Sequence, residues 1–263
     1  MDKSRFPKLR NKAIMVCIPT TAGTASEVSR SIVITEGGIK YGIGNMEMVP
    51  DIAILDPVVT RSLPPRLTAE TGMDAMCHAV EAFVSTRANY LSDILAKQAV
   101  RDIYTYLPLA YKEGGNLEYR EMMLNASMIA GLAFTNVSLG ITHSLAHAIG
   151  SVFKLPHGLA NAVLLPYVAA FNEKSETAKE RYRVLAEGIA ESDFVQALLS
   201  LNEKLHLPLS LQELLGEEEI HEKMDMIIEL AAKDGCTKTN PVIPDEEGFR
   251  GIILDAFYGK VRK

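Results

Sequence analysis

The chain has 263 residues, the size of one large domain or of one and a half ordinary ones. Its composition is 48% hydrophobic and 23% charged, which is typical of a globular protein that buries a substantial core. The net charge is −6 and residues of both signs are mixed along the chain, so nucleic acid is not expected as a partner.

Three features predict a cytoplasmic protein without a membrane segment. The three cysteines, Cys17, Cys77 and Cys236, match neither a disulfide framework nor a CxxC metal pair, so they are expected to be buried, reduced thiols. The first twelve residues are basic but lack the apolar core of a signal peptide. The longest apolar stretch, 159–171, is interrupted by Pro166 and is too short to span a bilayer.

The first sixty-five residues have the patterns of extended structure. Two short apolar runs, 13–18 and 52–55, are typical of buried strands. Segments 31–35 and 40–43 flank Gly37-Gly38, which predicts a hairpin.

After Pro65 the sequence is rich in Ala, Leu, Met, Glu and Lys at helical spacing. The predicted helices are 67–87, 91–106, 118–135, 142–150, 158–171, 175–191, 193–205, 217–232 and 246–258. The predicted breaks fall at Pro108, Gly114-Gly115, Gly140, Pro156, Pro208 and Asn240-Pro241.

The predicted fold is therefore mainly α, in two domains. Residues 1–65 form a small β-rich part and residues 66–263 a large all-helical domain. Four short strands without covering helices would leave edges unpaired and a face exposed. Either they form a small sheet packed on the helical domain, or they are the tail of a domain whose start lies outside the chain.

Four of the six histidines, together with one aspartate, lie in two short contexts that suggest a metal site. Asp74 and His78 are four residues apart, as are His143 and His147, so each pair shares one helix face. His157 lies in a turn from which the chain can return to His143. Imidazoles with a single carboxylate suit Fe(II) or Zn(II).

A simpler explanation exists for each pair, because an Asp/His pair at this spacing is most often a helix-surface hydrogen bond. The surrounding residues here are apolar and small, however, where an unpartnered polar group is costly. The spacing alone leaves both explanations open. His206 and His221 lie in charged surroundings and are expected to be solvated.

Three stretches carry a resemblance to a known family. TGMDAMCHAVEAF, GITHSLAHAIGSVFKLPHG and PTTAGTASE resemble segments of the iron-containing (group III) alcohol dehydrogenase family. Ala25 stands where that family usually has glycine, which we expect to matter little. Asp234-Gly235-Cys236 and Asn240-Pro241 resemble the family's closing helix turn, with Val242 in place of a common arginine. The resemblance runs almost from end to end.

The resemblance implies a set of residue roles and a dehydroquinate synthase-like architecture, in which residues 1–65 are a remnant of an α/β nucleotide-binding domain. The implied metal ligands are Asp74, His78, His143 and His157. The zinc-dependent glycerol dehydrogenases fit less well, because this chain carries the His78 ligand. Thr20, Thr21 and Thr24 match positions that line the nicotinamide cofactor, and Lys40 a lysine that touches its ribose. His147 matches an additional histidine near the nicotinamide and the substrate, with an implied catalytic role in orientation or proton relay.

The implied activity is a metal-dependent oxidoreductase that interconverts a small alcohol and its aldehyde or ketone with NAD or NADP. The metal acts as a Lewis acid on the substrate oxygen and the nicotinamide carries the hydride. Relatives form dimers or larger assemblies, so a homo-oligomer is expected.

One element of the family pattern does not occur in the sequence. No stretch fits the GGGS or GxGxxG loops that hold a dinucleotide pyrophosphate at a helix N-terminus. The chain is thus expected to start within the nucleotide domain, through truncation, a shortened gene product or a split enzyme. We expect metal binding to survive and dinucleotide affinity to be greatly weakened.

Two other classes of protein remain as alternatives. The first is a non-catalytic metal-binding helical fragment or pseudo-enzyme, which the absent phosphate loop favours. The second is a sugar-phosphate cyclase of the dehydroquinate synthase type. The PTTAGTASE stretch and the Asp74/His78 pair argue against that cyclase.

Overall fold

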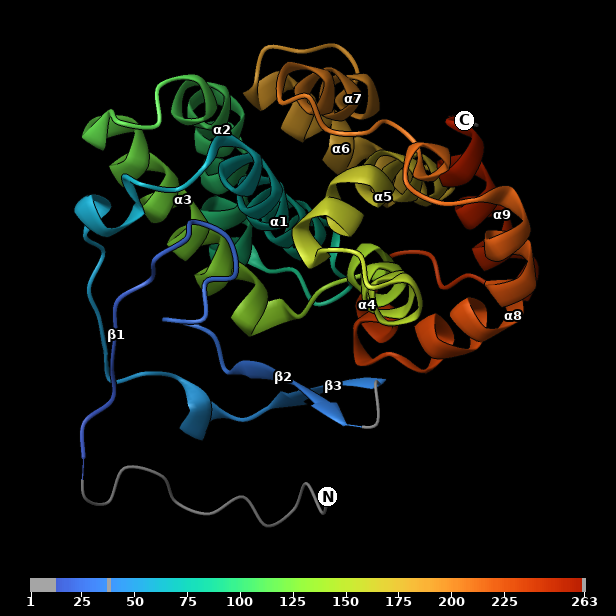
Figure 1. Ribbon diagram of the computed structural model, residues 1–263, viewed down its shortest axis with the longest axis horizontal. Helices are drawn as coiled ribbons and strands as arrows, with labels where there is room; N and C mark the ends of the chain where they lie inside the picture. The colour runs from blue at the N-terminus through green and yellow to red at the C-terminus, as the bar shows by residue number, and fades with distance from the viewer. Residues whose placement is uncertain (1–12, 37–38, 262–263) are drawn as a thin grey trace.

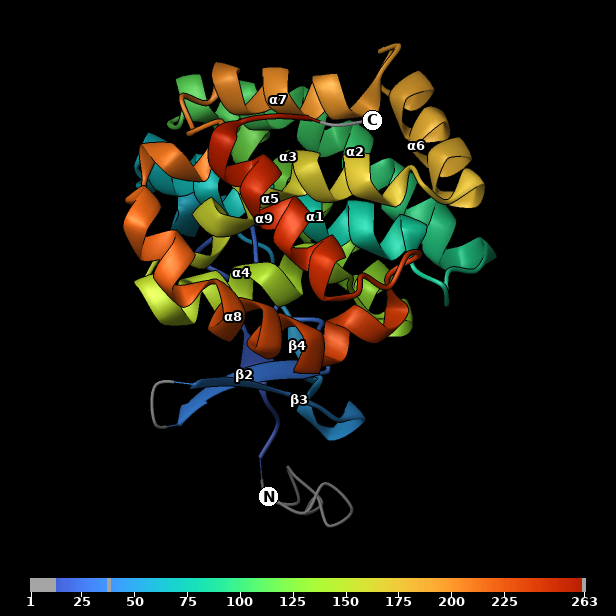
Figure 2. The same ribbon diagram turned by 90° about the vertical axis from the view of Figure 1, so that its right-hand side faces the viewer.

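The computed structural model describes residues 13–36 and 39–261. Helices make up most of the described chain, and the strands lie outside the helical body (Figures 1 and 2). The α-helices are α1 (Pro65–Val84), α2 (Tyr90–Lys112), α3 (Leu117–Val137), α4 (Ile141–Phe153), α5 (His157–Asn172), α6 (Glu176–Gly188), α7 (Phe194–Lys204), α8 (Glu217–Lys233) and α9 (Glu246–Tyr258). Short 3-10 turns lie at Met46–Met48, Pro57–Thr60, Leu211–Glu213 and Gly235–Thr239.

Every predicted helix occurs in the structure, with ends shifted by a few residues, because local capping chemistry sets the boundaries. Asn89 and Asn116 accept hydrogen bonds from backbone N–H groups in the first turns of α2 and α3. Ser175, Asp193 and Asp245 do the same for α6, α7 and α9. The predicted mainly α fold is confirmed.

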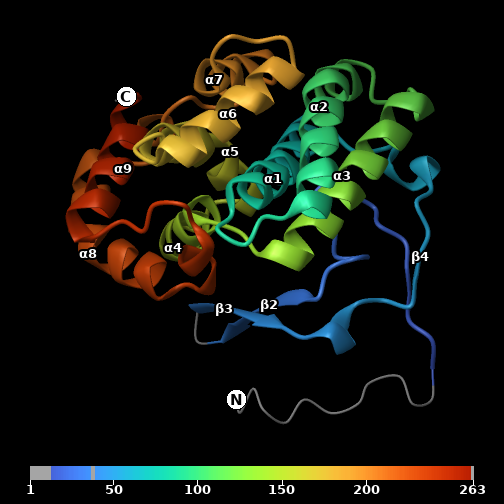
Figure 3. The ribbon, with the colours of Figure 1, turned by 180° about the vertical axis from the view of Figure 1, so that it is seen from behind.

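Helix α1 is the centre of the helical body. Nearly all of its residues from Thr68 to Val84 are buried, and α2, α3 and α5 pack around it (Figure 3). Small residues make this possible, since alanine and glycine let helix backbones approach closely; a Cβ built on Gly72 would collide with Leu107 of α2. Polar side chains on α1 therefore face other helices rather than solvent.

The predicted break at Pro108 is wrong, because α2 continues through it to Lys112. A proline inside a helix removes one backbone donor, and the neighbouring turn can persist where packing holds it. Leu107 and Ala110 are fully buried beside Pro108, and the N–H of Glu113 donates to the carbonyl of Leu109 to close the helix.

Pro166 also lies inside a helix, and here the lost hydrogen bond is replaced. A proline at 166 cannot donate to the carbonyl of Ala162, four residues earlier in α5. The amide of Asn202, on α7, donates to that carbonyl at 2.7 Å, and both residues are fully buried. The Asn202 side chain therefore connects α7 to α5 at the point where α5 lacks a backbone hydrogen bond.

The strands form two separate pairs. β2 (Ser31–Glu36) and β3 (Ile39–Gly44) are antiparallel, with Ser31 opposite Gly44, which confirms the predicted hairpin. Its turn, Gly37-Gly38, lies outside the described residues. β1 (Val16–Cys17) and β4 (Ile52–Ala53) are parallel, with Val16 opposite Ile52.

The prediction that 13–18 and 52–55 are buried strands is wrong. Ile14 is 71% exposed, Val16 48% and Ile52 46%. An apolar run predicts burial because parallel strands normally lie between two layers of helices. Within the described residues no helix covers β1 and β4, so their apolar side chains meet solvent.

Among the described residues, no single helix is long and apolar enough to cross a membrane. Helices α3 and α4 are long and apolar enough to span a membrane only if they are taken together, and the pair is bent by 102° at the break between them.

Candidate metal centre

Helix α1 supplies the first two candidate ligands, Asp74 and His78. They are one turn apart on a helix, and both side chains are buried. The Nε2 atom of His78 lies 3.9 Å from Oδ1 of Asp74. On the other side of the ring, Nδ1 of His78 lies 3.2 Å from the carbonyl oxygen of Gly23. Donation from Nδ1 to that carbonyl leaves the Nε2 lone pair directed toward Asp74.

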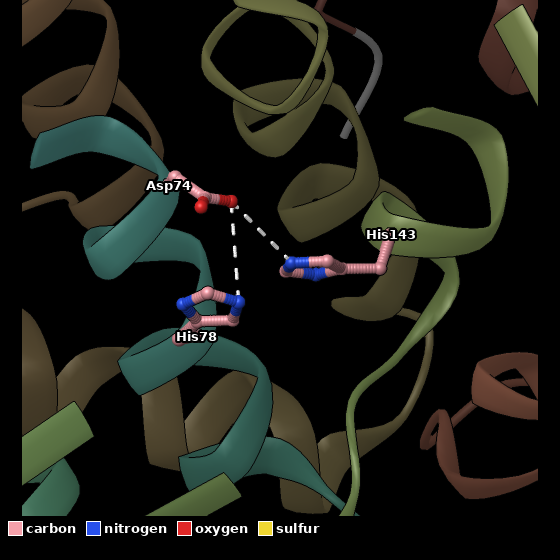
Figure 4. Close-up of side chains that lie close together, drawn as sticks. All are labelled: Asp74, His78 and His143. Carbon is pink, nitrogen blue, oxygen red and sulfur yellow. Dashed lines mark ion pairs between the residues drawn. The ribbon is translucent and has the colours of Figure 1, made fainter. Parts of the chain in front are cut away.

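Helices α4 and α5 bring the other two candidate ligands to the same carboxylate oxygen. His143 lies in the first turn of α4, and its Nε2 atom is 3.7 Å from Oδ1 of Asp74 (Figure 4). His157 is the first residue of α5, and its Nε2 atom is 3.4 Å from the same oxygen. Between them, Lys154 adopts a left-handed conformation that ends α4 and lets the chain return. The structure thus brings together, from three helices, the four residues that the resemblance implied as ligands.

Glu81, one further turn along α1, holds His143 in place. Its Oε2 atom lies 2.6 Å from Nδ1 of His143, and its Oε1 atom accepts a hydrogen bond from the backbone N–H of Thr142 at 2.7 Å. The carboxylate therefore orients the imidazole and satisfies an N–H group at the start of α4. Glu81 was not among the predicted site residues, although its position three residues after His78 places it on the same helix face.

Asn161 stands among the candidate ligands and was missed. It lies one turn after His157 in α5 and is fully buried. Its Nδ2 atom donates to Oδ1 of Asp74 at 2.8 Å, and lies 3.1 Å from Nε2 of His157 and 3.3 Å from Nε2 of His143. Its Oδ1 atom is buried without a hydrogen-bond partner in the described structure. The four-residue spacing from His157 is the signal that could have found it.

The start of α4 is fixed by a residue nearly one hundred positions later. Oδ1 of Asn240 accepts a hydrogen bond from the backbone N–H of Ile141, and its Nδ2 donates to Oδ1 of Asn172 at 2.7 Å. A Cβ on Gly140 would lie 2.7 Å from Oδ1 of Asn240 and 3.0 Å from Oε1 of Glu81. The glycine therefore admits both polar groups to the helix end that carries His143.

The pKa values at this cluster follow from burial and from the mixture of charges. Burial would raise the pKa of Asp74, but the neighbouring imidazoles hold it well below its usual range. Burial lowers the pKa of His157 to about 3 and that of His78 to about 4, although Asp74 opposes both shifts. Burial also acts to lower the pKa of His143, but the negative charges of Glu81 and Asp74 outweigh it and raise that pKa. His78 and His157 are thus neutral at pH 7, the protonation state that binds metals.

His147, the predicted catalytic histidine, lies beside the cluster rather than within it. Its ring stacks on that of His157, with centroids 5.1 Å apart. Its Nδ1 atom lies 2.8 Å from Oδ2 of Asp234, at the turn between α8 and the last 3-10 segment. The Asp234 partner was missed, since nothing in the sequence links positions 87 residues apart.

The predicted cofactor residues lie in the loop that contacts α1. Thr20 and Thr24 are exposed and Thr21 is half-buried, while Gly23 between them packs against Thr71 of α1. A Cβ at Gly23 would lie 2.8 Å from the carbonyl oxygen of Thr71, so only glycine allows the loop to reach His78. Lys40 lies in β3 opposite Thr35, and its side chain is outside what the structure describes.

Ala25, in the same loop, matters more than the sequence suggests. Its φ angle is 52°, a left-handed conformation that costs a non-glycine residue about 1–2 kcal/mol. Its methyl group packs against α3, where a Cβ on Gly131 would lie only 2.3 Å away. Alanine therefore combines backbone strain with a buried contact, so the replacement of glycine is not neutral.

The donor set fits a divalent transition metal. Ligand atoms of Asp74, His78 and His143 lie within 4.8 Å of one another, and Nε2 of His157 lies 3.4 Å from Oδ1 of Asp74. Imidazole nitrogens with one carboxylate oxygen are ligands that Fe(II) and Zn(II) accept. Their buried carboxylate and amide neighbours, Glu81 and Asn161, are the kind of outer partners that orient metal ligands.

Comparison with known proteins agrees with this geometry. Residues 68–257 match the model of the Fe-containing alcohol dehydrogenase family, C-terminal, and residues 2–57 match that of iron-containing alcohol dehydrogenase. An NADPH-dependent butanol dehydrogenase of Clostridium saccharobutylicum is 42% identical over 98% of this chain and 69% of its own. A 1-propanol dehydrogenase of Citrobacter freundii is 38% identical over 90% of this chain and 68% of its own.

A solved structure, that of an iron-containing alcohol dehydrogenase from Thermococcus thioreducens, superposes with a TM-score of 0.90 at 38% identity. The match covers 97% of this chain and 67% of that one, so the chain spans about two thirds of the length of its relatives. The chain belongs to the iron-containing alcohol dehydrogenase family. The predictions of an enzyme and of the alcohol dehydrogenase class are confirmed.

Proposed function

We propose that Asp74, His78, His143 and His157 bind one divalent metal ion, Fe(II) or Zn(II), and that the chain interconverts a small alcohol and its aldehyde or ketone. The observation that carries the proposal is the approach of three imidazole Nε2 atoms to one oxygen of Asp74, at 3.4–3.9 Å. A metal ion bound there would act as a Lewis acid on the substrate oxygen, while NAD or NADP exchanges the hydride.

The protein's own contribution is to orient groups and to move a proton. Asp74 supplies the one negative charge among the ligands, and Glu81 keeps His143 turned toward it. Asp234 holds Nδ1 of His147, which leaves Nε2 of that ring to pass a proton between the substrate oxygen and solvent. The side chain of His147 is 14% exposed, so the ring can exchange a proton with solvent.

We propose that the loop with Thr20, Thr21 and Thr24 lines the nicotinamide. The support is the location of the loop, since the carbonyl oxygen of Gly23 lies 3.2 Å from Nδ1 of His78. Lys40 is proposed to contact the cofactor ribose. The choice between NAD and NADP is open to direct measurement with both cofactors.

The proposed substrates are short aliphatic alcohols and aldehydes. Relatives named for butanol and 1-propanol support this class. Phe134 of α3 stacks on His78 with ring centroids 4.4 Å apart, which gives the site an apolar wall suited to an alkyl chain.

The test is turnover by the purified, anaerobic, iron-loaded chain, followed as NADH or NADPH oxidation with a panel of short aldehydes. Turnover that disappears in His157→Ala and persists in the surface control His221→Ala is expected if the described residues contain the complete centre. A chain that retains bound iron after His157→Ala would contradict the ligand assignment.

A second function, metal binding without turnover, is favoured by one observation. The 263 residues contain no glycine-rich phosphate loop, so we propose that this chain alone binds NAD weakly. Micromolar NAD binding in a calorimetric titration of the 263 residues would contradict that proposal. Bound metal without turnover would support it.

We also propose a cytoplasmic homodimer that binds neither nucleic acid nor membranes. The three cysteines are free thiols, which suits a reducing compartment, and the net charge of −6 disfavours nucleic acid. The two-domain division at residues 65 and 66 is likewise a proposal. Light scattering of the purified chain would measure its oligomeric state.

A further inference from the structure

A second cluster of metal-binding side chains lies next to the proposed centre. His147, Asp234 and Cys236 each offer a ligand atom, and the three atoms lie within 4.8 Å of one another. The His147 ring stacks on His157, so the cluster is beside the first ligand set and shares no residue with it. We propose that this cluster is a separate binding site for a thiophilic divalent cation such as Zn²⁺.

The turn after α8 sets two of the three ligands in a chelating arrangement. Asp234 is the N-cap of a 3-10 segment, and its Oδ1 atom accepts a hydrogen bond from the backbone N–H of Cys236 at 2.8 Å. That bond orients the carboxylate, and the Cys236 sulfur lies within 4.8 Å of the ligand atoms of Asp234 and His147. The third ligand arrives from α4, where Nδ1 of His147 is already 2.8 Å from Oδ2 of Asp234. Zinc sites commonly combine two ligands that are close in the sequence with another that is far from them in the sequence.

A His–Asp hydrogen bond alone would need no metal, and the thiol is what distinguishes this cluster. A thiolate and a carboxylate together balance the charge of a divalent cation, and sulfur favours Zn²⁺ over Fe²⁺. The all-nitrogen-and-oxygen set around Asp74 has no such preference built into its donors. The two sites therefore differ in chemistry although they are neighbours.

The cluster is also accessible. The side chains of His147 and Asp234 are 14% and 17% exposed, so an ion can enter and a water can complete four-fold coordination. Burial, with Asp234 nearby, raises the pKa of Cys236, so its sulfur carries a proton at neutral pH. Coordination would transfer that proton to solvent as the metal–sulfur bond forms.

Occupation of this site would engage His147. If His147 relays the proton in catalysis, which rests on the proposed function, Zn²⁺ bound here would inhibit the enzyme. The binding itself does not depend on turnover, so its test can be separate from the activity assay.

Anaerobic titration of the metal-depleted 263-residue chain with Co²⁺ tests the site, because a cobalt–thiolate bond gives a near-ultraviolet charge-transfer band that nitrogen and oxygen ligands do not. We expect the band in the wild type, in His157→Ala and in Cys17→Ser, and its loss in Cys236→Ser. Added Zn²⁺ should bleach it. A folded wild type without the band, or a band that persists in Cys236→Ser, would overturn the proposal.

A histidine variant provides a second criterion if Cys236→Ser does not fold. His147→Ala should weaken the Co²⁺ affinity, measured from the same band, by more than roughly tenfold. Loss of a residue that only hydrogen-bonds to a metal ligand already weakens binding by about tenfold or more, and loss of a ligand should weaken it further. His221→Ala, which removes an exposed histidine of α8, should leave that affinity unchanged. Equal affinities for the wild type and His147→Ala would contradict the assignment.

Discussion

Asn161 contacts three of the candidate ligands, because its amide nitrogen donates to Asp74 and lies within 3.3 Å of two imidazoles. We expect Asn161→Ala to weaken metal affinity roughly 10–100-fold, since Asp74 loses the donor that fixes its orientation. Competition with a chromophoric chelator measures this change. Asn136→Ala, at an exposed asparagine of α3, is the matched control and should have no effect.

Glu81 offers a second test at the residue scale. Glu81→Gln keeps a side-chain oxygen that can accept from Nδ1 of His143, but it removes the buried negative charge. Metal affinity is expected to fall by about tenfold or more, with the helical circular dichroism unchanged. Glu187→Gln on the surface of α6 is the control. Equal affinities in Glu81→Gln and the wild type would show that the charge is not needed.

The resemblance implied the four candidate ligands, which the structure brings together, but the sequence did not indicate the residues that orient them. Asp74 and His78 could be found because a four-residue spacing places side chains on one helix face whatever surrounds the helix. The contacts of His143 with Glu81 and of His147 with Asp234 join positions 62 and 87 residues apart. Such pairs depend on how the helices pack, which periodicity within one helix does not specify.

At the scale of elements, α5 approaches α1 closely at Gly158. A Cβ on Gly158 would lie 2.2 Å from the carbonyl oxygen of Glu70, and that oxygen belongs to the backbone, which has little freedom to move. Gly158→Ala should therefore push the start of α5 away from α1 and carry His157 from Asp74. We expect a loss of about 1–3 kcal/mol in stability together with weaker metal binding.

Thermal unfolding and chelator competition would measure the two effects of Gly158→Ala. Gly251→Ala in α9 is the control, since nothing lies within 4 Å of its added methyl group. That variant should raise stability, because alanine favours a helix over glycine by about 1 kcal/mol. A Gly158→Ala protein with wild-type stability and metal affinity would contradict the close packing of the two helices.

The helices were predictable and the environment of the strands was not. Caps and apolar periodicity are local, so the nine predicted helices all occur within the described residues. The prediction of a helix break at Pro108 was wrong because Leu107 and Ala110 are buried in the core and hold the turn around it. The prediction that β1 and β4 are buried was wrong because burial of a strand depends on a covering layer of helices, which no local sequence pattern encodes.

At the scale of the whole molecule, a bound metal would join α1 to α4 and α5, which lie more than fifty residues later in the sequence. A ligand that binds only the folded state stabilises it by about 2.7 kcal/mol at a concentration one hundred times its dissociation constant. Excess Fe(II) or Zn(II) should therefore raise the thermal midpoint of the wild type, and calorimetry would measure the shift. In His157→Ala the shift at the same metal concentration should be much smaller.

The hydrogen bond from Asn202 to Ala162 also has a consequence for the history of this chain. With Pro166 present, loss of Asn202 leaves a buried carbonyl without a partner, whereas with another residue at 166 the helix supplies its own donor. The two positions are thus not free to change in either order. A lineage can lose the proline first and the asparagine afterwards, but the reverse path passes through a destabilised intermediate, so descendants that keep Pro166 should retain a donor at position 202.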